Sequence, residues 1–157
     1  GVDENIHKKY LTAARSTWYA LENRLPSPIW VSVFNRNGVR FIRNEANISN
    51  LTTFHCIYTN KKDQSSVDLL FAYLLTDVAK QIFDDNRREY GNGLQKFEPN
   101  DLNKAKMLDL SLLDKKIVNK VMELYTKYRE TVINQFPDES FLNDINEIFK
   151  NKYIQCS

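Results

Sequence analysis

The hydrophobic pattern of this sequence changes its period once, near residue 60. Before that point, residues 29–34, 39–43 and 52–58 alternate as strands do, and the turn sequence Asn35-Arg36-Asn37-Gly38 separates the first two. After it, apolar residues recur mainly at spacings of three and four, which is typical of helices. Strands first and helices later predict an α+β fold rather than alternating βαβ units.

The first half of the chain is predicted to build a β-rich part around one helix. Residues 6–14 can form a short helix or arm, and residues 16–22 an aromatic-rich strand. The strands at 29–34 and 39–43 should pair as a hairpin. Ser65 and Ser66 can cap a central helix over 65–83.

The second half is predicted to be mainly helical. A short strand at 94–97 precedes a helix start at Pro99. Long helices should follow over 111–136, with Ser111 and Asp114 as a capping box, and over 138–152.

The expected architecture is therefore an N-terminal antiparallel β-rich part packed on a central helix, followed by C-terminal helices. We expect residues 1–110 to form a core and residues 111–157 to form a helical extension packed on it as one structural unit.

Composition excludes several classes of protein. With 42% hydrophobic residues and a net charge of +2, the 157 residues fit neither a disordered nor a fibrous chain. No apolar run approaches the roughly 18 residues of a membrane span, and residues 1–9 are polar, which predicts a cytoplasmic protein without membrane contact. Cys56 and Cys156 lack a CxxC or histidine companion, so reduced thiols are expected rather than a metal site.

Motifs for catalysis are missing from the sequence. It contains no glycine-rich phosphate loop, no zinc-protease helix and no nucleophile elbow. Asp84 and Asp85 are expected to form surface ion pairs with Arg87 and Arg88. We therefore expect no catalytic residue, metal or cofactor within this chain.

Arginine is concentrated near the N-terminus, where five of the eight arginines precede residue 44, interleaved with tryptophan, tyrosine and phenylalanine. Arginine and asparagine can pair bidentately with guanine and adenine edges. Composition alone favours solvated strand residues for the arginines, and it leaves the asparagines of residues 44–50 open between turn formation and ligand contact. His55 is either a half-buried core residue or a polar group offered to a ligand.

Two groups of short motifs add information that the periodicity lacks. The first runs in the order Arg15, Trp18-Tyr19, Pro28-Ile29, Arg40-Phe41-Ile42-Arg43-Asn44, Asn50, Thr53-Phe54-His55 and Tyr58. The second comprises Tyr90-Gly91-Asn92-Gly93-Leu94, Lys96-Phe97-Glu98-Pro99 and Leu102. Together they resemble the C-terminal half of bacterial DNA adenine-N6 methyltransferases from type II restriction-modification systems, of the TaqI and BsuBI/PstI kind. The resemblance covers residues 10 to about 110.

In that family an N-terminal Rossmann-like domain binds S-adenosylmethionine and carries an Asn-Pro-Pro-Tyr or Asn-Pro-Pro-Phe motif, while the C-terminal part recognises the target. This chain has no Asn-Pro-Pro sequence and no glycine-rich cofactor loop. The resemblance therefore implies a recognition domain without enzymatic activity of its own. It would hold double-stranded DNA for a catalytic domain of the same parent polypeptide, an S-adenosylmethionine-dependent DNA adenine-N6 methyltransferase.

The resemblance also implies a set of DNA-contacting residues. At one of them, Asn92, this chain departs from the glycine that is usual in the family's turn. The expected contacts are Arg15, Arg36, Arg40, Arg43, Asn44, Asn47, Asn50, Thr53, His55, Tyr90, Asn92 and Lys96.

Two other hypotheses remain open at this point. The amphipathic segments 111–136 and 138–152 could make the chain a helical protein-interaction module that docks a partner subunit without touching DNA. A free-standing enzyme would need a reaction centre that the sequence does not show.

Overall fold

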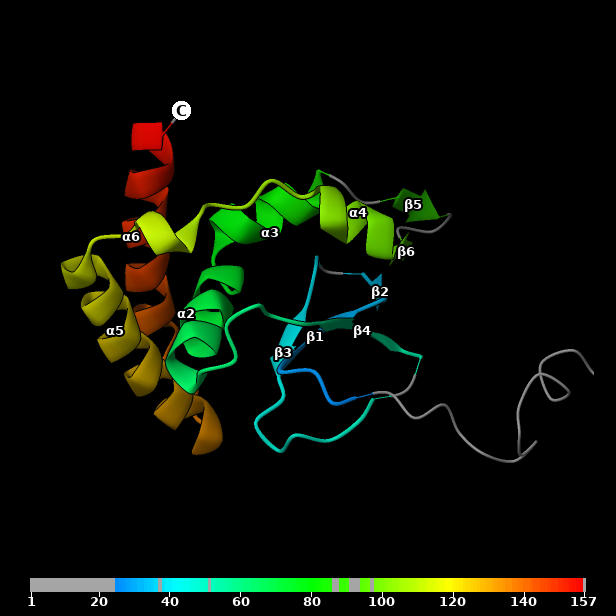
Figure 1. Ribbon diagram of the computed structural model, residues 1–157, viewed down its shortest axis with the longest axis horizontal. Coiled ribbons are helices and arrows are strands. Elements are labelled where there is room, and N and C mark those ends of the chain that lie inside the picture. The colour runs from blue at the N-terminus through cyan, green and yellow to red at the C-terminus, as the bar shows by residue number, and fades with distance from the viewer. Residues whose placement is uncertain are drawn as a thin grey trace, which may run out of the picture.

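The computed structural model describes residues 25–36, 38–50, 52–85, 88–90, 94–96 and 98–156. The helix or arm expected at 6–14 and the strand expected at 16–22 lie outside these residues. Within them the chain is α+β, with short antiparallel strands early and helices later, as the change of period predicts (Figure 1).

The central sheet has three strands, with β1 (Ile29–Ser32) between β3 (Phe41–Arg43) and β4 (Phe54–Ile57). The predicted hairpin is confirmed, because β1 pairs antiparallel with β3, and Gly38 in the connection has a φ of +85°. Alternation along β1 buries Ile29 and Val31 on one face. Since β3 and β4 are both antiparallel to β1, the loop between them must cross from one end of the sheet to the other.

The strand predicted over 29–34 is wrong beyond Ser32. It ends at Ser32, and β2 (Phe34–Asn35) belongs to a second sheet with β6 (Leu94–Lys96) and β5 (Arg88–Tyr90). Side chains cause this turn at Val33, because Ser32 Oγ donates to Phe34 O over 2.9 Å and Asn35 Nδ2 donates to Ser32 O over 2.8 Å.

The single helix predicted over 65–83 is also wrong, because two helices occupy this stretch: α2 (Gln64–Leu74) and α3 (Asp77–Asp84). The fully buried Thr76 separates them. Its hydroxyl donates to Tyr73 O over 2.6 Å and accepts from Ala79 N over 3.3 Å, which caps α3.

Asp63, rather than the predicted serines, caps α2. Its carboxylate accepts from Ser66 N over 2.9 Å. A carboxylate is a strong cap at this position because it also meets the positive end of the helix dipole.

The C-terminal half follows the predicted order. It comprises α4 (Pro99–Lys104), the short 3-10 helix η1 (Leu110–Leu112), α5 (Lys115–Ile133) and α6 (Glu139–Cys156). The predicted capping box is not formed. Ser111 lies inside η1, with its N–H bonded to Asp109, and Asp114 precedes α5 without a side-chain cap bond.

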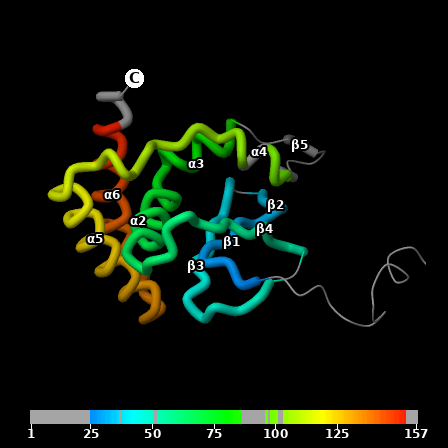
Figure 2. The backbone as a smooth tube through the Cα atoms, in the orientation of Figure 1, coloured from blue at the N-terminus to red at the C-terminus, as the bar shows by residue number. Residues whose placement is uncertain are grey.

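One apolar core joins the strands to the C-terminal helices. Figure 2 shows α2 between the central sheet and the pair formed by α5 and α6. Aromatic rings connect these layers: the Phe71–Tyr125 centroids lie 6.1 Å apart and the Tyr73–Phe149 centroids 5.0 Å apart. Since Phe149 is fully buried in the same cluster as Ile29, α6 completes the core around the sheet.

Candidate nucleic-acid interface

Several predicted contact residues gather where β1 ends. Ser32 N donates to Arg40 O over 3.0 Å, and Val33 N donates to Thr53 O over 3.2 Å. The backbone therefore holds the segments of Arg40 and Thr53 on either side of the end of β1. Pairing of β2 with β6 adds a third segment, because Phe34 lies opposite Lys96. We call this region the β1–β2 surface, made of Phe34, Arg36, Arg40, Thr53 and Lys96.

The β1–β2 surface offers cations beside an exposed aromatic ring. Arg36 and Arg40 are exposed, and neither forms an ion pair with any residue that the structure describes. Phe34 is half exposed, and Lys96 Nζ lies 5.9 Å from its ring centroid and 2.5 Å from a Glu98 oxygen. Unpaired guanidinium groups and a cation over an aromatic face suit phosphates and bases.

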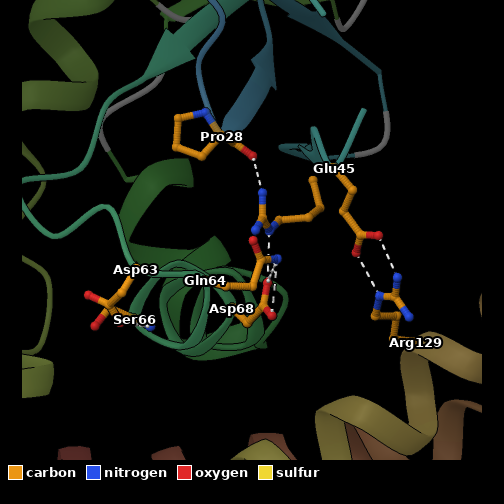
Figure 3. Close-up of polar contacts among 8 residues, drawn as sticks. Pro28, Glu45, Asp63, Gln64, Ser66, Asp68 and Arg129 are labelled. Carbon is orange, nitrogen blue, oxygen red and sulfur yellow. Dashed lines mark hydrogen bonds and ion pairs between the residues drawn. The ribbon is translucent and has the colours of Figure 1, made fainter. Parts of the chain in front are cut away.

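Arg43 has a different position from Arg36 and Arg40. Its Nε donates to Asp68 Oδ1 on α2 and its Nη1 donates to Pro28 O, both over 2.9 Å. Only 7% of its side chain is exposed. Figure 3 shows Asp68 beneath Pro28, with Gln64 of the same helix also reaching the carboxylate. The guanidinium group therefore fastens β3 and the start of β1 to α2.

The sequence does contain a signal for this burial. Arg43 stands two residues after Phe41, so the two side chains share one face of a strand, and Phe41 is the kind of residue that a core requires. Cross-strand pairing with the buried Ile29 adds to this placement. The residue type of Arg43 favours a DNA contact, whereas its register on the strand favours burial.

The asparagines largely organise the loop between β3 and β4. Asn44 is buried, and its Nδ2 donates to Ser27 O and Ile48 O, both over 2.8 Å. Asn50 Nδ2 donates to Phe54 O over 2.9 Å, and its Oδ1 accepts from the Cys56 thiol. These bonds fit turn formation, which the sequence left open. Asn47 is exposed, with a φ of +51°.

His55 lies away from the β1–β2 surface. It pairs with the buried Val31, so it belongs to the face of the sheet that meets the helices. There it lines a cavity of about 420 Å³ together with Leu74, Phe83 and Met107. Its half-buried position fits the core alternative of the sequence prediction.

Three further candidates have limited structural description. Arg15 and Asn92 lie outside the described residues. Tyr90 is the last residue of β5, and its backbone lies opposite that of Leu94 in β6.

An ion pair that the sequence did not predict joins α5 to the loop after β3. Arg129 Nε and Nη2 donate to Glu45 Oε1 and Oε2 over 2.6 and 2.5 Å, which the two dashed lines in Figure 3 show. The hydrogen bonds from Arg129 lower the pKa of Glu45 below its usual value. No local pattern could reveal this pair, because the two residues are 84 positions apart.

The described residues contain no group of three or more histidine, cysteine or acidic side chains that could hold a metal ion. Among the same residues, no helix combines the length and apolarity that crossing a membrane requires.

Fold and surface thus define an α+β domain with an exposed cationic and aromatic region at the end of its central strand. The model of the C-terminal domain of the type II methyltransferase M.Eco57I matches residues 1–142 of this chain. The chain belongs to this family of type II methyltransferase C-terminal domains.

Two curated relatives agree with this family. The chain is 59% identical to the type II methyltransferase M.AccI of Acinetobacter calcoaceticus, over 99% of this chain and 29% of the relative. It is 24% identical to the type II methyltransferase M.XamI of Xanthomonas campestris pv. amaranthicola, over 68% of this chain and 20% of the relative. The chain thus spans less than a third of the length of each relative. No solved structure matches it.

Proposed function

We propose that this chain is the target-recognition domain of a DNA adenine-N6 methyltransferase and binds double-stranded DNA through the β1–β2 surface. The observation that carries the proposal is the position of Arg36 and Arg40 near the exposed ring of Phe34 in a type II methyltransferase C-terminal domain. Both arginines are exposed, and neither forms an ion pair with another described residue. Lys96 adds a third cation and Thr53 a hydroxyl group at the same place. Such a set can both position phosphates and read base edges.

We propose that fewer residues contact DNA directly than the sequence predicted. Arg43 and Asn44 are buried and bonded within the domain, so their part in DNA binding is to hold the strands and the loop in place. The cations of the β1–β2 surface belong to three different chain segments. A surface of this kind can contact a duplex on both flanks of a target base, which helps to offset the few kcal/mol that flipping the base costs.

The methyl transfer itself would be the task of a catalytic domain in the same parent polypeptide, with S-adenosylmethionine as methyl donor. This assignment rests on the family and on the absence of an Asn-Pro-Pro motif and a glycine-rich loop from the sequence.

The proposal is tested by measuring duplex binding as a function of salt. Each cation that neutralises a phosphate releases counterions, so three cations should give a slope of log K against log salt of about −2.7. The parent methyltransferase should bind its target with this dependence added to that of its other contacts. Binding that does not change with salt, or no binding in the presence of the catalytic domain, would contradict the proposal.

The alternative function, a helical docking module that never touches DNA, has less support. It requires α5 and α6 to offer free apolar faces along their length, whereas Tyr125, Ile145 and Phe149 of these helices are buried in the domain core, and the exposed Val132 and Ile133 lie at the end of α5.

A further inference from the structure

A second surface lies at the opposite end of β1 from the proposed DNA contacts, and it is apolar. Its large side chains come from the start of β1, from the loop after β3, from the end of β4 and from the end of α5. They are Leu25, Ile48, Tyr58, Val132, Ile133 and Phe136, exposed by between 46% and 84%. We call this region the apolar face. Figure 1 shows the loop after β3 and the end of α5 along the same lower edge of the molecule.

Polar bonds hold the segments of the apolar face together. Tyr58 Oη donates to Leu25 O over 2.8 Å, which fixes the end of β4 against the segment before β1. The Glu45–Arg129 ion pair fixes the loop to α5, one turn before Ile133. These bonds therefore hold together the backbone segments that carry the apolar side chains.

The apolar face is also hollowed. One hollow of about 360 Å³ is lined by Leu25, Tyr58 and the loop residues Asn44 and Asn47. A second, of about 430 Å³, lies between β3 and α5, where Phe41, Tyr128, Val132 and Ile133 contribute to its walls. Arg40 of the β1–β2 surface also borders this second hollow. Arg43 and Glu45 border both hollows, so the two are adjacent.

Hydrogen bonds define the turn that follows α5. Gln135 adopts a φ of +65°, and Phe136 N donates to Thr131 O over 3.0 Å. Asp138 N then donates to the Thr131 hydroxyl group over 3.0 Å. This turn holds Phe136 at 84% exposure. Phe136 thus follows Val132 and Ile133, which line the second hollow, and an exposed aromatic side chain in an apolar region is typical of an interface anchor.

We propose that the apolar face docks the methyltransferase part that precedes this domain in the parent polypeptide. The chain matches only 29% of M.AccI, and the family describes a C-terminal domain, so most of such a relative lies outside the matching region. The polypeptide before Leu25 joins the described part of the domain within this face. A covalent link raises the effective concentration of the preceding part of the polypeptide at the face.

This inference rests on the proposed function, and it assigns DNA binding and docking to two different surfaces of the domain. The β1–β2 surface lies at the end of β1 and most of the apolar face near its start, with Arg40 bordering the second hollow between them. The domain can therefore hold DNA with one surface while the other is docked. β1, which is central in its sheet, forms the link between them.

The test compares two cysteine variants of the whole parent methyltransferase, Phe136→Cys and Leu112→Cys. Both native side chains are almost fully exposed in the domain, by 84% and 82%. Leu112 lies before the start of α5, roughly 30 Å along the helix from the apolar face, and serves as the matched control. Labelling by a thiol reagent is followed at each site by peptide mass spectrometry and normalised to labelling in urea.

Docking should slow labelling of Phe136→Cys roughly tenfold relative to Leu112→Cys, because an interface anchor is withdrawn from solvent. Equal normalised rates would overturn the inference. DNA binding is measured separately on the same proteins. Slower labelling at residue 136 without DNA binding would support docking and contradict the proposed function. DNA binding with equal labelling rates at the two sites would support the proposed function and contradict docking.

Discussion

Arg43 on β3 and Asp68 on α2 form an ion pair with a separation of 2.9 Å, and only 7% and 15% of their side chains are exposed. The same guanidinium group also binds Pro28 O at the start of β1. One arginine therefore connects two strands of the central sheet to the helix that covers it. This pair adds a polar contact to the apolar core that joins the β-rich part to the helical part.

Loss of Arg43 should destabilise the domain. Replacing it in Arg43→Gln leaves the Asp68 carboxylate largely buried without its cation, which costs roughly 3 kcal/mol in the free energy of unfolding. Urea denaturation followed by circular dichroism measures the change. Lys127→Gln is the control, since it breaks an exposed pair with Glu123 and should cost less than about 0.5 kcal/mol. Equal effects of the two substitutions would contradict the structural role of Arg43.

Removal of Arg36 and Arg40, the two exposed arginines of the β1–β2 surface, should weaken DNA binding without unfolding the domain. Arg36→Gln with Arg40→Gln is expected to lower the affinity for duplex DNA about tenfold and to reduce the salt slope by about 2. Titration of labelled duplex at several salt concentrations measures both quantities.

The matched control removes the same charge elsewhere. Lys120 and Lys127 lie on α5, about half exposed and both paired with Glu123. Their double glutamine variant should retain most of the affinity. If the two double variants lose affinity equally, binding reflects total charge and not the β1–β2 surface.

Truncation of Phe149 should show that α6 belongs to the core. The Phe149 ring is fully buried, 5.0 Å from Tyr73 in an edge-to-face arrangement. Phe149→Ala removes this contact and leaves a cavity, so we expect a loss of about 4 kcal/mol in the free energy of unfolding. Leu112→Ala, at a site 82% exposed, should change it by less than about 0.5 kcal/mol. Thermal unfolding of both variants separates these values, and a small effect at Phe149 would favour an independent helical module.

The Glu45–Arg129 pair should make stability depend on pH in acid. The pKa of Glu45 is lowered from 4.5, first by its hydrogen bonds from Arg129. A carboxyl group whose pKa is lower in the folded state contributes stability above its unfolded pKa and loses that contribution as the pH falls through the folded value. Since both side chains are more than a third exposed, the contribution is below about 1 kcal/mol.

Arg129→Gln should therefore be less stable than the native chain near pH 7, and the difference should shrink as the pH falls below 4.5. Urea midpoints at a series of pH values measure the difference. Lys115→Gln removes an equal charge from the start of the same helix and should show no such convergence. A constant difference for Arg129→Gln across the series would mean that the pair does not act through the ionised Glu45.

Local sequence patterns predicted which helices and strands form, but they predicted the first and last residues of these elements poorly. Alternation predicted β1, β3 and β4, and spacings of three and four predicted α5 and α6. The break between α2 and α3 escaped the pattern, because Leu75 continues the apolar spacing while the Thr76 hydroxyl group ends one helix and caps the next. Apolar spacing reports which side of a segment is buried and is insensitive to a polar side chain that binds the backbone.

The sequence likewise predicted only part of the candidate site. Residue types alone placed Arg36, Arg40 and Arg43 in one class, and the motifs that contain Arg40 and Arg43 led to the methyltransferase family. The tertiary structure separates them: Arg43 meets a carboxylate 25 positions away, whereas Arg36 and Arg40 remain exposed.

The sequence by itself determined the order of strands and helices, the buried faces and the family, because these depend on residues close together in the chain or on motifs in a fixed order. The tertiary structure decided which cations face solvent, how the strands divide between two sheets and where the apolar side chains gather. These features depend on contacts between distant residues, such as Glu45 with Arg129, for which local periodicity carries no information.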